Sequence, residues 1–154
     1  MILLLFPNRV CTFIAAILFS AAAITDYLDG YIARTRGLVS TLGKVMDPVA
    51  DKLLVSSGFI MLTALGWVPS WIVCIIIGRE IAVTGLRNIV AERGEDVSAS
   101  NLGKYKTGFQ IAAIIPLLIH YPFLGLNPQA VGAFFLLGAL GFTVLSGADY
   151  FFKF

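Results

Sequence analysis

The sequence predicts an all-α protein, a polytopic integral membrane helical bundle that forms a single domain over residues 1–154. Hydrophobic residues make up 58% of the chain and charged residues only 13%, and the mean hydropathy is +0.90. Soluble domains average about half apolar and about a quarter charged residues. Long apolar segments also alternate with short links, and this pattern is typical of a multispan helical protein.

Five apolar segments are predicted to be membrane-spanning helices, at residues 10–33, 43–65, 70–90, 103–120 and 130–146. Each approaches the roughly 20 residues that a helix needs to cross the hydrocarbon core. The apolar run of residues 1–6 is too short to span. We expect it to be the tail of a first helix whose beginning is absent from this sequence.

The charges in the links predict the orientation. Basic residues flank the first and third links and close the chain, at Arg34, Arg36, Lys44, Arg93, Lys104, Lys106 and Lys153. The second and fourth links, residues 66–69 and 121–129, carry no charged residue. By the positive-inside rule, the charged links face the cytoplasm of a cell (inner) membrane protein. The net charge of +2 is too small to indicate a nucleic-acid partner.

Four carboxylates lie at the facing ends of the first two segments. The two stretches read Asp26-x-x-Asp29-Gly30-x-x-Ala33-Arg34 and Gly43-x-x-x-Asp47-x-x-x-Asp51. Residues three or four apart share one face of a helix, and the short link between the segments predicts a helical hairpin. Carboxylates at a membrane helix usually face a bundle interior or a water-filled cavity. We therefore expect all four to converge at the joined end, close to the cytoplasm.

Four converging like charges repel one another unless cations neutralise them. Because the cluster offers only oxygen ligands, Mg²⁺ or Mn²⁺ fits it better than Zn²⁺. A structural alternative is a cluster that is salt-bridged to Arg34, Lys44 and Lys52. A divalent-cation transporter is the rival of a different class, but its polar groups should cross the full membrane depth, whereas residues 53–66 and 111–119 have few.

The dipeptide Asp47-Pro48 resembles a helix start, because proline is tolerated at the first helical position and an acidic residue is favoured before it. It predicts that the second helix begins there, with Asp47 as its cap.

The two acidic stretches match, at all eight specified positions, the signature of the CDP-alcohol phosphotransferase family. The resemblance implies a membrane enzyme that uses a divalent metal to move a phosphatidyl or similar group from a CDP-linked donor onto an alcohol, releasing CMP. Residues 78–80, 85–87 and 103–107, and the ending 145–150, resemble the phosphatidylglycerophosphate synthase branch. The resemblance also implies six spans and, for many members, a homodimer.

The resemblance assigns roles to the residues of the signature. Asp26, Asp29, Asp47 and Asp51 are implied metal ligands for Mg²⁺ or Mn²⁺, and Asp51 is also the implied general base. The implied CDP-donor-binding residues are Asp29, Gly30, Ala33, Arg34 and Gly43.

A second group of basic residues predicts where a second anion binds. Arg79, Arg87, Lys104 and Lys106 are expected to form a basic pocket beside the carboxylates. Such a pocket favours an acceptor that carries its own phosphate, and the branch resemblance suggests sn-glycerol 3-phosphate, with CDP-diacylglycerol as donor in the membrane lipid. The open alternatives are an Arg79–Glu80 pair that is only structural and lysines that extend to the headgroups.

The sequence leaves more than one acceptor open. Phosphatidylglycerol would make the protein a cardiolipin synthase, and inositol phosphate would make it a phosphatidylinositol-phosphate synthase. An inactive, truncated relative that only binds nucleotide or partner subunits is the third possibility that we keep.

Overall fold

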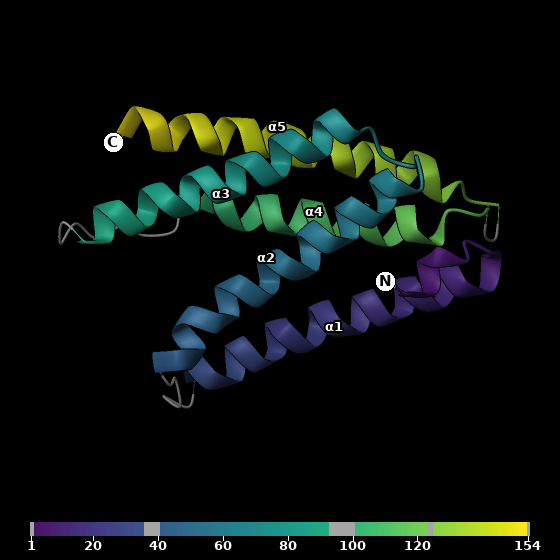
Figure 1. Ribbon diagram of the computed structural model, residues 1–154, viewed down its shortest axis with the longest axis horizontal. Helices are drawn as coiled ribbons and strands as arrows, with labels where there is room; N and C mark the ends of the chain where they lie inside the picture. The colour runs from purple at the N-terminus through teal and green to yellow at the C-terminus, as the bar shows by residue number, and fades with distance from the viewer. Residues whose placement is uncertain (1, 36–40, 93–100, 123–124, 154) are drawn as a thin grey trace.

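Helices follow one another in alternating directions along the chain (Figure 1). The computed structural model describes residues 2–35, 41–92, 101–122 and 125–153, and the side chains at 33–34, 41–48, 91–92, 101–104 and 150–153 lie outside the description. The elements are a short 3-10 helix, η1 (Ile2–Leu5), and the α-helices α1 (Arg9–Thr35), α2 (Thr41–Ala64), α3 (Ser70–Glu92), α4 (Asn101–Ile119) and α5 (Pro128–Lys153). The predicted all-α class is confirmed, with one helix at each of the five predicted segments.

Local signals in the sequence explain several helix ends. Asn8 caps α1, because its Oδ1 accepts a hydrogen bond from the Cys11 backbone N–H at 3.0 Å. Gly66, with φ 71°, ends α2, and the bonds from the Gly66 N–H to the Thr63 carbonyl and from the Trp67 N–H to the Leu62 carbonyl form a Schellman motif.

The start of α2 differs from the sequence prediction. The helix begins at Thr41, so Asp47 and Pro48 lie in its second turn and the predicted cap at Asp47 is wrong. A cap contributes only about 0.5–2 kcal/mol, whereas six further helical residues satisfy their own backbone groups. Each of these residues adds a backbone hydrogen bond, and together the bonds outweigh the one that Pro48 removes.

Helix α4 lies at the centre of the fold and contacts α1, α2 and α5. Its Ile114, Leu117 and Leu118 are buried among side chains such as Phe59 of α2 and Phe19 of α1. An apolar surface on all sides is what a central helix requires.

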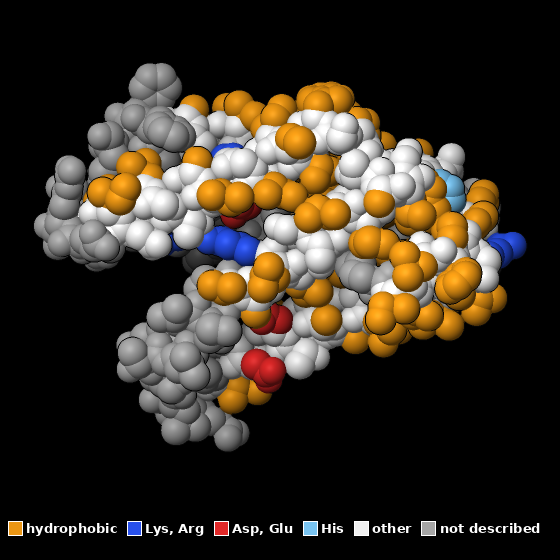
Figure 2. Space-filling view, viewed as in Figure 1, with side chains coloured by type: hydrophobic (Ala, Val, Ile, Leu, Met, Phe, Trp, Pro, Cys, Tyr) orange, Lys and Arg blue, Asp and Glu red, His pale blue; other side chains and the backbone are white. Residues whose placement is uncertain are grey.

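We call the end where α1, α3 and α5 finish and α2 and α4 begin the motif end, and the opposite end the far end (Figure 1). The far end is held together by contacts between links. The His120 ring stacks on Trp67 with centroids 3.8 Å apart, and Arg9 Nη2 donates to the Pro122 carbonyl at 3.0 Å. At the motif end the α1–α2 pair diverges from the other helices, and a hollow opens between them (Figure 2).

Two helices of the described chain are long and apolar enough to cross a membrane, α1 over Arg9–Ile32 and α5 over Pro128–Asp149, and α4 holds a shorter apolar stretch, Tyr105–Ile119. Large apolar side chains point outward on both long helices, among them Leu18 and Phe134. Charged residues interrupt the apolar surface of α2 and α3.

Glycines of α5 allow close packing on α4. A Cβ on Gly132 would lie 2.4 Å from Leu117 Cγ and 3.2 Å from the Leu117 backbone nitrogen, and one on Gly138 would lie 2.8 Å from Phe109 Cδ1. A Cβ on Gly141 would meet nothing within 4 Å. The first two glycines therefore serve internal helix packing.

We expect Gly132→Ala to destabilise the protein by about 1–3 kcal/mol, because α4 or α5 must move to make room for the methyl group. The matched control is Gly141→Ala, which fills open space and should gain up to about 1 kcal/mol from helix propensity. Thermal unfolding of the purified variants in detergent measures both. Equal stability of the two variants would contradict the close contact.

Candidate active site

The carboxylates predicted from the sequence lie at the motif end. Asp26 and Asp29 stand in the last turns of α1, the first half-buried and the second exposed, and Asp51 is half-buried in α2. The Asp51 carboxylate lies within electrostatic range of the Asp26 carboxylate. The hairpin of α1 and α2 therefore brings together carboxylates that are 25 residues apart in the chain.

Asp47 lies one helical turn before Asp51 in α2, and its side chain is outside the described residues, as are those of Ala33, Arg34, Gly43 and Lys104. Among the described side chains, no group of three or more His, Cys, Asp or Glu lies close enough to hold a metal ion. The expected ligand set includes Asp47, so the metal site stays a prediction. The approach of Asp26 to Asp51 and the all-carboxylate donor set fit a hard divalent cation.

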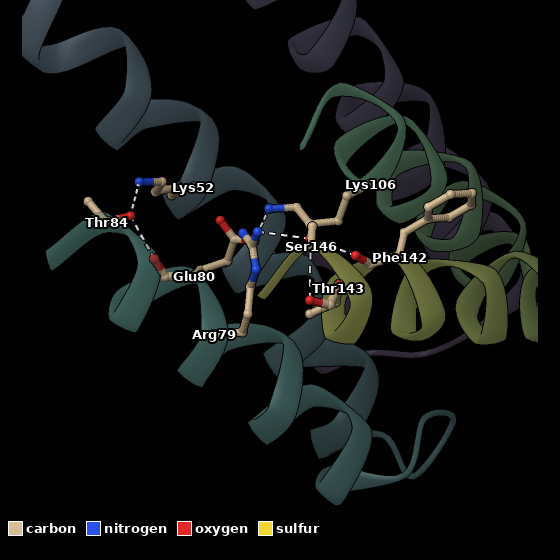
Figure 3. A network of polar contacts seen from close by, with 8 residues as sticks. All are labelled: Lys52, Arg79, Glu80, Thr84, Lys106, Phe142, Thr143 and Ser146. Atoms are coloured by element: carbon tan, nitrogen blue, oxygen red, sulfur yellow. Dashed lines mark hydrogen bonds and ion pairs between the residues drawn. The ribbon is translucent and has the colours of Figure 1, made fainter. Parts of the chain in front are cut away.

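A polar network lies on the other side of Asp51 and joins α3, α4 and α5 (Figure 3). Glu80 of α3 is at its centre. Its Oε1 accepts from Lys106 Nζ of α4 and lies 3.4 Å from Arg79 Nη1. Arg79 Nη2 donates to Ser146 Oγ of α5 at 2.8 Å. Glu80 thus bridges two buried cations, with exposed fractions of 11% for the Arg79 side chain and 6% for the Lys106 side chain.

Lys52 connects α2 to the same region. Its Nζ donates to Thr84 Oγ1, and the Thr84 hydroxyl donates to the Glu80 backbone carbonyl at 2.6 Å (Figure 3). The charges of Lys106, Glu80 and Lys52 all act on Asp51. The carboxylates of the α1–α2 hairpin and the network on α3 to α5 therefore face one another, and Figure 2 shows acidic and basic side chains together in this hollow.

A small cavity of about 20 Å³ extends inward from Asp51. Its polar lining consists of Asp51, Lys52, Ser56, Glu80, Thr107 and Gln110. Gln110 is only 2% exposed, and its Nε2 has no hydrogen-bond partner among the described residues. A volume of this size holds one water-sized polar group. The site thus combines two carboxylates, a half-buried lysine and a buried amide donor around that space.

This arrangement agrees with the comparison with known proteins. A family model described as CDP-alcohol phosphatidyltransferase matches residues 1–145. The chain belongs to the CDP-alcohol phosphatidyltransferase family. The family resemblance predicted from the eight signature residues is confirmed.

Curated relatives of this phosphatidyltransferase cover most of its length. A protein of Bacillus subtilis strain 168 named CDP-diacylglycerol–glycerol-3-phosphate 3-phosphatidyltransferase is 49% identical over 138 residues, which is 90% of this chain and 72% of the relative. A protein of the same name from Rickettsia typhi is 39% identical over 97% of this chain and 86% of its own length. A probable phosphatidylglycerophosphate synthase of Mycobacterium tuberculosis is 40% identical, covering 89% and 64%.

The predicted acceptor-binding residues differ in their burial and in their contacts. Lys106 is 5% exposed and paired with Glu80, so the alternative that it extends to the headgroups is wrong. Arg79 is in contact with Glu80 and Ser146, and Arg87 is half-buried eight residues further along α3. The structure thus joins two of the four predicted acceptor residues through one carboxylate.

Three residues of this region, Glu80, Lys52 and Gln110, were not predicted from the sequence as catalytic or binding residues. A signal for Glu80 was present, because an acidic residue within an apolar segment needs a cationic partner. Lys106, which also lies beside an apolar segment, was the available cation on the next helix. Gln110 had no such signal, since its burial depends on how α4 packs against α2.

Proposed function

We propose that this protein transfers the phosphatidyl group of CDP-diacylglycerol to sn-glycerol 3-phosphate, giving phosphatidylglycerophosphate and CMP. The observation that carries the proposal is the 49% identity over 90% of the chain to a relative with that name. The geometry supports it, because a carboxylate of the α1–α2 hairpin faces buried cations of α3 and α4. Charged groups for the anionic donor and for the anionic acceptor thus lie at the same end of the bundle.

In the proposed mechanism, the acceptor hydroxyl attacks the phosphorus of the phosphatidyl group. The new P–O bond forms as the bond from that phosphorus to the CMP oxygen breaks, and CMP leaves with the electron pair. Asp51 takes the proton of the attacking hydroxyl. Asp29, Gly30, Ala33, Arg34 and Gly43 bind the CDP part of the donor, and Arg79, Arg87, Lys104 and Lys106 bind the phosphate of the acceptor.

The donor set fits Mg²⁺ or Mn²⁺, which Asp26, Asp29, Asp47 and Asp51 would hold. Such an ion neutralises charge on the donor pyrophosphate and on the leaving CMP. The buried cations of α3 and α4 lie on the opposite side of Asp51 and balance the second phosphate.

We also propose that all five helices cross the cell membrane, with the motif end in the cytoplasm. The basic residues at that end support this orientation. The soluble acceptor and CMP would then enter and leave on the cytoplasmic side.

The test is CMP release from CDP-diacylglycerol by the purified protein in detergent with Mg²⁺. The acceptors sn-glycerol 3-phosphate, inositol phosphate, serine and phosphatidylglycerol are offered in turn. We expect release only with sn-glycerol 3-phosphate. Release with phosphatidylglycerol or inositol phosphate instead would assign another acceptor, and no release with any of them would contradict the proposed transferase.

Removal of divalent ions should stop the reaction, because the clustered carboxylates would otherwise repel the donor pyrophosphate. We expect chelation followed by desalting to lower CMP release by at least about 100-fold, the order that several kcal/mol of charge stabilisation implies. Mg²⁺ or Mn²⁺ should restore it. Full activity in the desalted protein would contradict a metal role for the four aspartates.

A further inference from the structure

The ending of the chain, residues 145–150, resembles the phosphatidylglycerophosphate synthase branch but has no role in the function proposed above. Two of its residues, Ser146 and Gly147, are buried, and Ser146 is 0% exposed. They lie on α5 where that helix packs against α3. The Ser146 hydroxyl contacts the Arg79 guanidinium (Figure 3), and a Cβ added at Gly147 would meet the same side chain.

Ser146 presents its hydroxyl oxygen to the guanidinium. The Ser146 hydroxyl donates to the Phe142 carbonyl of its own helix at 2.6 Å. Its proton is therefore committed to the helix, and its lone pairs are left to accept from Arg79 Nη2 at 2.8 Å. A hydrogen bond to a charged donor is stronger and more directional than a neutral one.

Gly147 leaves room for the aliphatic part of the Arg79 side chain. A Cβ at this position would lie 3.2 Å from Arg79 Cγ and 3.7 Å from Arg79 Nε. An added methyl group would therefore require the arginine stem to shift by a few tenths of an ångström. By contrast, a Cβ added at Gly141, six residues earlier on α5, would meet nothing within 4 Å.

Glu80 contacts the other terminal nitrogen of the guanidinium and is shared with Lys106. Its Oε1 lies 3.4 Å from Arg79 Nη1, and the same oxygen pairs more closely with Lys106 Nζ. A guanidinium fixed in this way suits a phosphate, whose oxygens accept from its planar donors.

We propose that Ser146 and Gly147 are positioning residues that hold the Arg79 guanidinium where the acceptor phosphate binds, so that the C-terminal helix sets the affinity for the acceptor. This inference rests on the function proposed above. It assigns to α5 a role that follows neither from the carboxylate signature nor from the basic residues.

The experiment measures KM and kcat of the full chain in detergent with Mg²⁺, with each substrate varied in turn. We expect Ser146→Ala to raise KM for sn-glycerol 3-phosphate about fivefold to tenfold, the order expected for the net contribution of one hydrogen bond. The kcat value and KM for CDP-diacylglycerol should stay within about twofold. Gly147→Ala should act in the same direction, and Gly141→Ala should match the unmodified protein.

A double-variant cycle separates positioning from general damage to the fold. In the Arg79→Gln background, Ser146→Ala should cause no further rise in KM for the acceptor, because the group that it positions is gone. An equal rise in both backgrounds, an unchanged acceptor KM in Ser146→Ala, or an equal rise for both substrates would overturn the inference. If Ser146→Ala does not fold, Gly147→Ala in both backgrounds decides by the same criteria.

The two proposals can fail separately. No CMP release from the unmodified protein with sn-glycerol 3-phosphate refutes the proposed function. Normal release, together with unaffected KM values in both α5 variants, refutes only the role of Ser146 and Gly147.

Discussion

Replacing Asp51 with Asn should lower the rate of CMP formation by about 10²–10⁴-fold, the range that one general base contributes, if Asp51 has the proposed role. The amide that this change introduces cannot take the proton of the acceptor hydroxyl. Asp51 is the half-buried carboxylate on which Asp26, Lys106, Glu80 and Lys52 all act, and it lines the cavity that extends into the bundle. Steady-state CMP release at saturating substrate measures the loss.

Binding of CDP-diacylglycerol to Asp51→Asn should remain measurable, because the other donor-binding residues are intact. Near-normal turnover of Asp51→Asn would remove Asp51 from the role of base. Loss of donor binding together with turnover would instead assign it to metal binding alone.

Replacing Glu80 with Gln should destabilise the fold by about 3 kcal/mol, because it leaves two buried cations without their shared carboxylate. Glu80 forms ion pairs with both Arg79 and Lys106, and the side chains of both partners are largely buried. The change keeps the size of the side chain, so packing is preserved. Thermal unfolding of the purified protein in detergent measures the loss.

The double variant Glu80→Gln, Lys106→Met is the control for charge. It removes one of the two cations that shared the carboxylate and should recover a large part of the lost stability, since removal of a whole buried pair is often near neutral. Equal stability of the unmodified protein and Glu80→Gln would show that solvent, rather than Glu80, compensates the cations.

Much of the fold follows from local properties of the chain. The five apolar runs predicted the five helices, and Asn8 and Gly66 are capping residues of types that the sequence makes recognisable. The start of α2 was predicted wrongly because the signal at Asp47-Pro48 is local and weak. Residues 41–46 extend the helix, since each added residue contributes a further backbone hydrogen bond.

The candidate site also has features that the sequence predicts and features that it does not. The spacing of Asp26, Asp29, Asp47 and Asp51 is a property of helix geometry, so the sequence alone placed them in pairs on two helices. The pairing of Lys106 with Glu80 and the contact of Arg79 with Ser146 join residues that are 26 and 67 positions apart. No periodicity relates such residues.

The sequence by itself determined the helical class and the five helices, because these depend on composition and on the 3.6-residue period of one helix, and its eight signature residues identified the family. Only the tertiary structure decided which charges meet across helices. That choice depends on the angle and depth at which α3, α4 and α5 pack, which close contacts such as Gly132 on Leu117 and Gly147 on Arg79 determine.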